Sequence, residues 1–248
     1  MNPFNDLAEI YDAMVDWNRR LSHEEPFYRQ LFTRVSAKRV LDAACGVGHH
    51  AARFHAWGLD VEAADISPAM LARARARAGE PAGLKWVQRS YDRPAGTSVF
   101  DIAICVGNSL ALADDEAAMD RAVAAMLTAV RPGGAVVVHV LNIWILADGP
   151  CLWQKCVRMK FAGQEVLVLK GIHRCGNRAC VEVIVMDPAG KVLKNESPRL
   201  LGVEAGLLGE MARRHGAGGI EFFGGYKSQP YDRGSSEDII MVARKAGG

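Results

Sequence analysis

The chain has 248 residues, half of them hydrophobic, so it is long enough to bury the core of one large α/β domain. Its 30 Lys and Arg residues against 28 Asp and Glu residues leave a net charge of +2, which predicts no strong attraction to nucleic acid or to an anionic membrane. No run approaches the roughly 20 apolar residues of a membrane helix, and no signal-peptide pattern opens the chain, so we expect a cytoplasmic protein.

The first half of the chain alternates strand patterns with helix patterns. Strand patterns are expected at 39–44, 60–64, 84–88, 101–106 and 135–141. A helix pattern covers 48–57, and another begins with Ser67 as N-cap and Pro68 in the first turn. A third helix shows an apolar stripe from Met119 to Val130. This alternation predicts a mostly parallel, Rossmann-like sheet with right-handed crossovers.

The second half of the chain has a different rhythm. Strand-like runs at 157–161, 166–173, 179–186 and 191–201 are separated by short turns, which predicts a small antiparallel cap. A helix over 204–215 and strands at 220–226 and 238–244 follow, and the two strands bring the main sheet to seven. We therefore predict an α/β fold in three parts: an N-terminal lid segment and cofactor-binding core over 1–146, an inserted cap over 147–203, and a core-completing segment over 204–248.

The six cysteines give no metal-binding pattern. None forms a C-x-x-C pair, and no pair of histidines completes a zinc-like set, so the sequence predicts no metal site. Cys175 and Cys180 could face each other across a hairpin. A disulfide and a pair of reduced thiols are both compatible with that spacing.

A glycine loop with two acids carries the functional signal. Asp42 ends the first strand, Gly46 and Gly48 follow it, and Asp65 ends the next strand. The glycines allow a tight turn and a close approach by a ligand, and a strand-end carboxylate at the position of Asp65 can bind ribose hydroxyls. The pattern predicts an adenosine-type cofactor on a Rossmann-like sheet.

Asp42 decides between two cofactors. The segment GVGHHA fits a dinucleotide fingerprint, so an NAD-dependent oxidoreductase is one alternative. However, Asp42 would lie close to the pyrophosphate, and like charges 4 Å apart repel by about 4 kcal/mol at an effective dielectric constant of 20. S-adenosylmethionine has no phosphate and carries a positive sulfonium and a positive ammonium group, so the same carboxylate favours it.

Several segments resemble class I S-adenosylmethionine-dependent methyltransferases, and among them the glycine N-methyltransferase-like branch. The resemblance rests on VLDAACGVG, the DIS after the second strand, DIAICVGNSLA and VRPGGAVVVHVLN. Ala44, where most of the superfamily has glycine, agrees with that branch. The C-terminal segment GGYKSQPYDRGSSEDIIMVARK looks like the family's final hairpin, which implies that the last strand of the sheet is reversed.

The resemblance implies a set of cofactor-binding residues. The methionine end would meet Asp42, Ala44 and the loop of Gly46 and Gly48, with Arg20 as the partner of the cofactor carboxylate. The ribose and adenine would meet the remaining residues and the lid: Tyr11, Trp17, Asp65, Ile66, Met70, Ser90, Tyr91, Val106 and Asn108.

The acceptor is predicted to be a small molecule methylated on nitrogen or oxygen. Glycine-methylating relatives carry an arginine immediately before the asparagine that corresponds to Asn142, and here that position is Leu141. A leucine cannot pair with a carboxylate, so we do not expect glycine as the acceptor and expect a less charged or larger molecule. In the cap, Arg158, Lys160, His173 and Arg199 are candidates for contact with an anionic substrate.

The sequence offers two candidate catalytic side chains. Asn108 is expected to face the substrate, and His139 is the candidate base for a hydroxyl acceptor, although a buried histidine bonded to backbone is the role that we favour for it. A catalytically silent module that only binds S-adenosylmethionine is a further alternative. The oligomeric state is not predicted.

Overall fold

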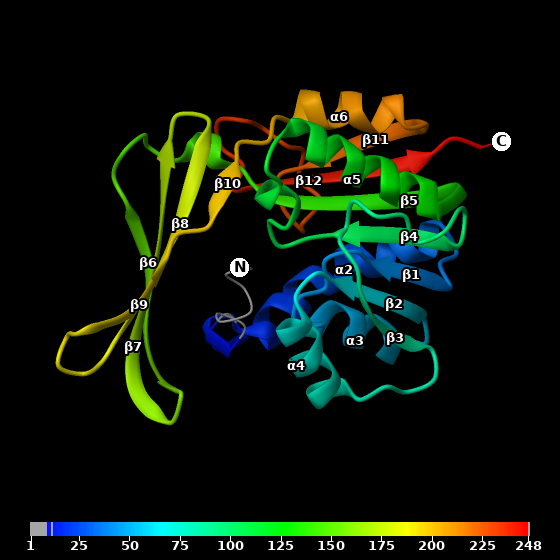
Figure 1. Ribbon diagram of the computed structural model, residues 1–248. Helices are drawn as coiled ribbons and strands as arrows, with labels where there is room; N and C mark the ends of the chain where they lie inside the picture. The colour runs from blue at the N-terminus through cyan, green and yellow to red at the C-terminus, as the bar shows by residue number, and fades with distance from the viewer. Residues whose placement is uncertain (1–8, 11, 248) are drawn as a thin grey trace.

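The computed structural model describes residues 9–10 and 12–247 and contains two β-sheets, shown in Figure 1. The larger sheet has seven strands in the order β11-β12-β5-β4-β1-β2-β3. Its strands are β1 (Arg39–Asp42), β2 (Asp60–Asp65), β3 (Leu84–Gln88), β4 (Phe100–Cys105), β5 (Val130–Leu141), β11 (Ala217–Phe223) and β12 (Asp238–Lys245). The first five are parallel, and β12 runs antiparallel to both of its neighbours. The predicted seven-stranded sheet with a reversed C-terminal hairpin is confirmed.

Helices cover both faces of this sheet. They are α2 (Trp17–Arg34), α3 (His49–Ala56), α4 (Pro68–Ala78), α5 (Glu116–Ala129) and α6 (Ala205–Arg214), with short 3₁₀ turns η1 (Leu110–Leu112) and η2 (Ile143–Ile145). Alternate residues of β5 face opposite ways: Val136 and Val138 pack with α5 and α6, whereas Val137 packs with α2, α3 and α4. The sheet is therefore the middle of three layers, and its residues are buried on both sides.

Two helices begin at a residue whose side chain caps the first turn. Ser67 accepts a hydrogen bond from the backbone N–H of Met70, and Asp115 accepts one from that of Ala118, so each caps its helix as its residue type favours. The lid segment, in contrast, contains an 18-residue helix, α2, that the sequence analysis did not predict. Pro26 lies inside this helix, where proline is normally unfavourable.

The second sheet is the antiparallel cap. Its strands are β6 (Leu152–Phe161), β7 (Gln164–Cys175), β8 (Arg178–Met186), β9 (Val192–Glu196) and β10 (Arg199–Leu201). The run predicted at 191–201 is two strands, because Pro198 between them has no N–H to donate to a ladder. Val166, Val168, Val183 and Val185 form one buried face together with Ile10 and Met14 of the N-terminal segment.

The cap register settles the cysteine question. Cys175 lies opposite Arg178, and Cys180 lies opposite His173, so the two cysteines do not face each other across the hairpin. All six cysteines are free thiols. Among the described residues, no helix is both long and apolar enough to span a membrane.

Candidate functional site

A cavity of about 650 Å³ lies at the carboxyl ends of the parallel strands, with cap residues at its rim. Clefts of this size at that edge of an open α/β sheet are typical of small-molecule sites. Most of the predicted cofactor residues line it, from α2, the glycine loop and the segments after β2, β3 and β4: Trp17, Arg20, Ala44, Gly46, Asp65, Ile66, Met70, Ser90, Tyr91 and Val106.

The two loop glycines have different tasks. Gly46 has a φ of +53° and no heavy atom within 4 Å of the place where a Cβ would stand, so its backbone is open to a ligand. Gly48 has a φ of +76°, and a Cβ there would come within 2.4 Å of the Trp86 ring. Gly48 therefore allows close packing between the loop and β3, and it does not line the cavity.

Asp65 fixes the loop and faces the cavity. Its Oδ2 accepts a hydrogen bond from the Gly46 N–H at 2.8 Å, and its Oδ1 accepts one from the Ser67 N–H at 2.8 Å. Each carboxylate oxygen can accept a second hydrogen bond, so the ligand side of Asp65 can still take hydroxyl groups. The neighbouring Ile66 is 58% exposed, which leaves an apolar surface beside the carboxylate for a flat base.

Asp42 lies buried beneath the loop with a relative exposure of 1%. Neither of its carboxylate oxygens has a hydrogen-bond partner of good geometry among the described residues, and only the backbone of Ala44 favours its ionised form. Burial, followed by the negative charge of Asp65, raises the pKa of Asp42 to about 8. A second negative group would raise the free energy needed to ionise Asp42, whereas a positive ligand would lower it. The site therefore suits a cation and not a pyrophosphate.

A buried ion pair positions the arginine of the cavity. Glu24 of α2 accepts a hydrogen bond from Arg20 Nε at 2.7 Å with one oxygen, and His50 Nε2 lies 2.6 Å from the other. Burial alone would raise the pKa of Glu24, but the hydrogen bond and charge of His50, and then Arg20, lower it to about 2. Arg20 also lies 5.2 Å from the ring centroid of Trp17, so the charge is held against an aromatic wall.

Comparison with known proteins shows what the chain is similar to. Residues 40–134 match the family model described as a methyltransferase domain. The glycine/sarcosine N-methyltransferase of Parasynechococcus marenigrum (strain WH8102) is 30% identical over 166 residues, which are 66% of this chain and 59% of that protein. The glycine N-methyltransferase of Oryctolagus cuniculus is 30% identical over 188 residues, with 66% of this chain and 63% of that protein covered. The chain thus spans about three fifths of the length of these curated relatives.

The chain is similar to the class I S-adenosylmethionine-dependent methyltransferases. Solved structures share the fold of this chain. DesVI from Streptomyces venezuelae superposes with a TM-score of 0.75 at 22% identity, covering 97% of this chain and 99% of that one. The S-adenosylmethionine-bound amino pentose methyltransferase CalS10 from Micromonospora echinaspora gives a TM-score of 0.72 at 22% identity, covering 96% and 97%. The comparisons support the predicted family and its cofactor, S-adenosylmethionine.

The two predicted catalytic candidates lie outside the lining of the cavity. Asn108 has a φ of +75°, and its side-chain oxygen accepts the backbone N–H of Leu141 at 2.5 Å. His139 Nδ1 accepts the N–H of Gly107 at 3.2 Å, and its Nε2 lies 3.1 Å from Asp238 Oδ1. Both side chains therefore tie the loop after β4 to β5, and their catalytic roles stay predictions.

The other predicted residues differ in whether they line the cavity. Tyr11 lies outside the described residues. Of the four cap charges, Arg199 lines the cavity and Arg158, Lys160 and His173 do not. Ten further residues line the cavity without having been predicted from the sequence: Ala43, Cys45, His50, Gly107, Ser109, Leu112, Ala113, Asp114, Arg178 and Pro198. Their adjacency to the glycine loop and to the turn after β4 marks most of them, but Arg178 and Pro198 depend on the fold of the cap.

Proposed function

We propose that this protein transfers the methyl group of S-adenosylmethionine to a nitrogen or oxygen atom of a small molecule. The observation that carries the proposal is the pair of acids around the loop, with Asp65 bonded to Gly46 and Asp42 buried below with only the Ala44 backbone favouring its ionised form. That arrangement suits a nucleoside that is positively charged and has no phosphate.

The residues around the cavity have complementary parts in binding the cofactor. Asp65 would accept hydrogen bonds from the ribose hydroxyls, and Ile66 and Met70 would flank the adenine. Arg20, held by Glu24, would pair with the carboxylate of the methionine portion. Asp42 would stabilise the positive charges through space, because it lies beneath the loop that the methionine portion would cross.

S-adenosylmethionine supplies the methyl group on a sulfonium that is a good leaving group. The protein's own contribution is then alignment and exclusion of water, and a neutral amine acceptor needs no general base. This fits the cavity lining, in which the candidate base His139 does not take part. The same observation favours one second function, a silent module that binds the cofactor without turnover.

The acceptor is proposed to carry an anionic group and not to be glycine. Arg178 and Arg199 line the cavity at the cap rim, and neither forms an ion pair with a residue in the described part of the chain. Two such cations can bind a carboxylate or a phosphate together. Leu141, at the end of β5, offers no charge for the carboxylate of an amino acid.

A turnover screen tests both parts of the proposal. Release of S-adenosylhomocysteine would be measured with a panel of matched amines and alcohols that are neutral, carboxylated or phosphorylated, with glycine included. We expect turnover with anionic members and little with glycine, and we expect Arg178→Ala/Arg199→Ala to lose that preference while still binding S-adenosylhomocysteine. Turnover led by glycine, or a preference that the double variant keeps, would refute the proposed acceptor class.

Binding without turnover on the whole panel would favour the silent module. The cofactor choice has its own measurement, a thermal-shift comparison of S-adenosylhomocysteine with NADH. We expect a shift with the first compound only, and stabilisation by NADH alone would overturn the proposal.

A further inference from the structure

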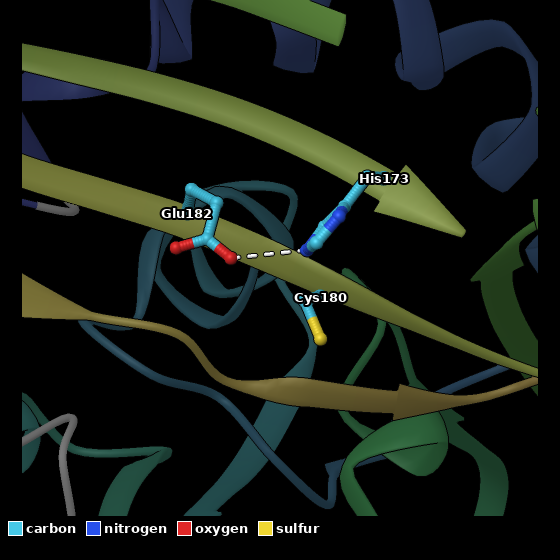
Figure 2. A group of neighbouring side chains, drawn as sticks. All are labelled: His173, Cys180 and Glu182. Carbon is cyan, nitrogen blue, oxygen red and sulfur yellow. Dashed lines mark hydrogen bonds and ion pairs between the residues drawn. The ribbon is translucent and has the colours of Figure 1, made fainter. Parts of the chain in front are cut away.

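The cap contains a group of three different metal-ligating side chains away from the cavity. His173 comes from β7, and Cys180 and Glu182 come from β8. Their donor atoms all lie within 4.8 Å of one another, and each residue is partly buried. Figure 2 shows the three side chains gathered at one place on the paired strands.

The strand register explains why they meet. His173 and Cys180 are directly opposite residues of an antiparallel pair, so their side chains leave the same face of the sheet. Glu182 is two residues beyond Cys180 on the same strand, and the period of two returns it to that face. Because both strands continue in regular pairing on either side, the backbone holds the three donors in place without a ligand.

Neighbouring groups already orient two of the donors. His173 Nε2 and Glu182 Oε1 are 3.1 Å apart, and the second oxygen of Glu182 accepts a hydrogen bond from the Ser197 hydroxyl. His173 Nδ1 lies 3.4 Å from the carbonyl oxygen of Gly149, to which it can donate. An imidazole that donates one N–H to a backbone carbonyl leaves its other nitrogen for a metal, which is the usual support around metal-bound histidines.

We propose that His173, Cys180 and Glu182 form a binding site for a divalent transition metal ion of the Zn²⁺ type. A thiolate, an imidazole and a carboxylate are the donors that Zn²⁺ takes, whereas Mg²⁺ and Ca²⁺ prefer oxygen alone. Zinc-ligand bonds of 2.0–2.3 Å place tetrahedral donors roughly 3.3–3.7 Å apart, so the three side chains need to close by only about 1 Å. The ion would replace the proton shared by His173 and Glu182.

The fourth position has a candidate donor. Gly171 lies directly opposite Glu182, and a Cβ on Gly171 would come within 2.6 Å of Cys151 Sγ. The Cys151 thiol therefore packs over the residue that neighbours the site, and it or a water molecule would complete the tetrahedron.

The site borders the acceptor side of the cavity without belonging to it. On the far side of β8, Cys180 is directly opposite Arg199 of β10, and Arg199 lines the cavity. An ion bound at Cys180 would tie β7 to the strand that holds β10 in register. We therefore expect metal binding to raise the thermal stability of the cap independently of whether the cofactor is bound.

Metal titration of the full chain, prepared without a histidine tag and stripped with a chelator in a non-thiol reductant, tests the site. We expect one Zn²⁺ per chain by calorimetry and, with Co²⁺ as a probe, a thiolate-to-metal charge-transfer band. Cys180→Ser and His173→Gln should each weaken Zn²⁺ binding on the order of 100-fold, and Cys180→Ser should weaken the cobalt band. Cys156→Ser, which changes an exposed thiol of β6 outside the group, is the matched control and should leave both signals unchanged.

Folding of the variants is checked by thermal unfolding in chelator, where all proteins should melt together. Added Zn²⁺ should then raise the melting temperature of the wild type and of Cys156→Ser only. The absence of saturable Zn²⁺ binding in the wild type, or binding that both Cys180→Ser and His173→Gln leave intact, overturns the proposal. Zinc binding is measured separately from turnover, so neither of these two results would count for or against the proposed methyl transfer.

Discussion

The buried carboxyl of Asp42 makes the free protein less stable as the pH rises. Its pKa is about 8 in the folded chain against an ordinary value of 3.8, because burial and the charge of Asp65 disfavour the ionised form. Between these two pH values the unfolded chain has released a proton that the folded chain retains. Stability therefore falls with increasing pH across that window, by at most about 1.4 kcal/mol per pH unit.

Asp42→Asn isolates this contribution. From pH 5 to pH 7 the wild type should lose up to about 2.7 kcal/mol that the variant does not lose, since asparagine cannot ionise. Any fixed cost of burying the amide shifts the variant's stability equally at both pH values and leaves the difference intact. Urea unfolding at pH 5, 6 and 7, without cofactor, measures it.

A matched variant and a clear negative result complete the test. Glu210→Gln removes an exposed carboxyl on α6 and should follow the wild type at every pH. If the stability difference between wild type and Asp42→Asn does not change with pH, then Asp42 ionises normally in the fold. The physical reason given for its preference for a cationic ligand would then be wrong.

Three further predictions concern the same loop. Affinity for S-adenosylmethionine, measured by calorimetry, should rise toward pH 8 in the wild type and stay flat in Asp42→Asn, because a bound cation favours the ionised carboxyl; parallel pH profiles would contradict this. Asp65→Ala should weaken S-adenosylhomocysteine binding by about 1–3 kcal/mol, and an unchanged dissociation constant would remove Asp65 from the site. Gly48→Ala should lower the melting temperature more than Gly46→Ala, because both variants strain a positive φ but only a Cβ at position 48 would meet Trp86. Gly46→Ala should instead weaken cofactor binding more. The reverse order of the two effects would show that the cavity lies elsewhere.

The cofactor half of the site could be predicted because its signals are local. A glycine that needs a positive φ, such as Gly46, and an acid at the end of a strand, such as Asp65, are fixed by a few neighbouring residues. The strands of the core follow from apolar runs that are buried on both faces. These features are determined before any long-range contact is specified.

The rest of the site could not be predicted, because it depends on the register of the strands and on the direction of individual side chains. The helix α2 carries Leu21, Tyr28 and Leu31 at helical spacing, but Pro26 inside it and its many polar residues hid the pattern. It supplies Arg20 to the cavity wall, and Glu24 behind it holds that arginine. His173 and Cys180 meet because a turn sets the pairing of β7 with β8, and the alternation of Cys180 and Glu182 was the only trace in the sequence. Asn108 and His139 sit at the predicted strand ends, but their side chains bond to backbone instead of entering the cavity.

The unfavourable ionisation of Asp42 is itself an argument about function. An aspartate this deeply buried lowers the stability of the free chain as it ionises, a loss that an asparagine, which cannot ionise, would not show. A bound cation above the open glycine loop would favour the ionised carboxyl and offset that loss. The free energy needed to ionise Asp42 in the free protein would therefore be offset by the positive charge of S-adenosylmethionine. A neutral or phosphorylated ligand would not offset it.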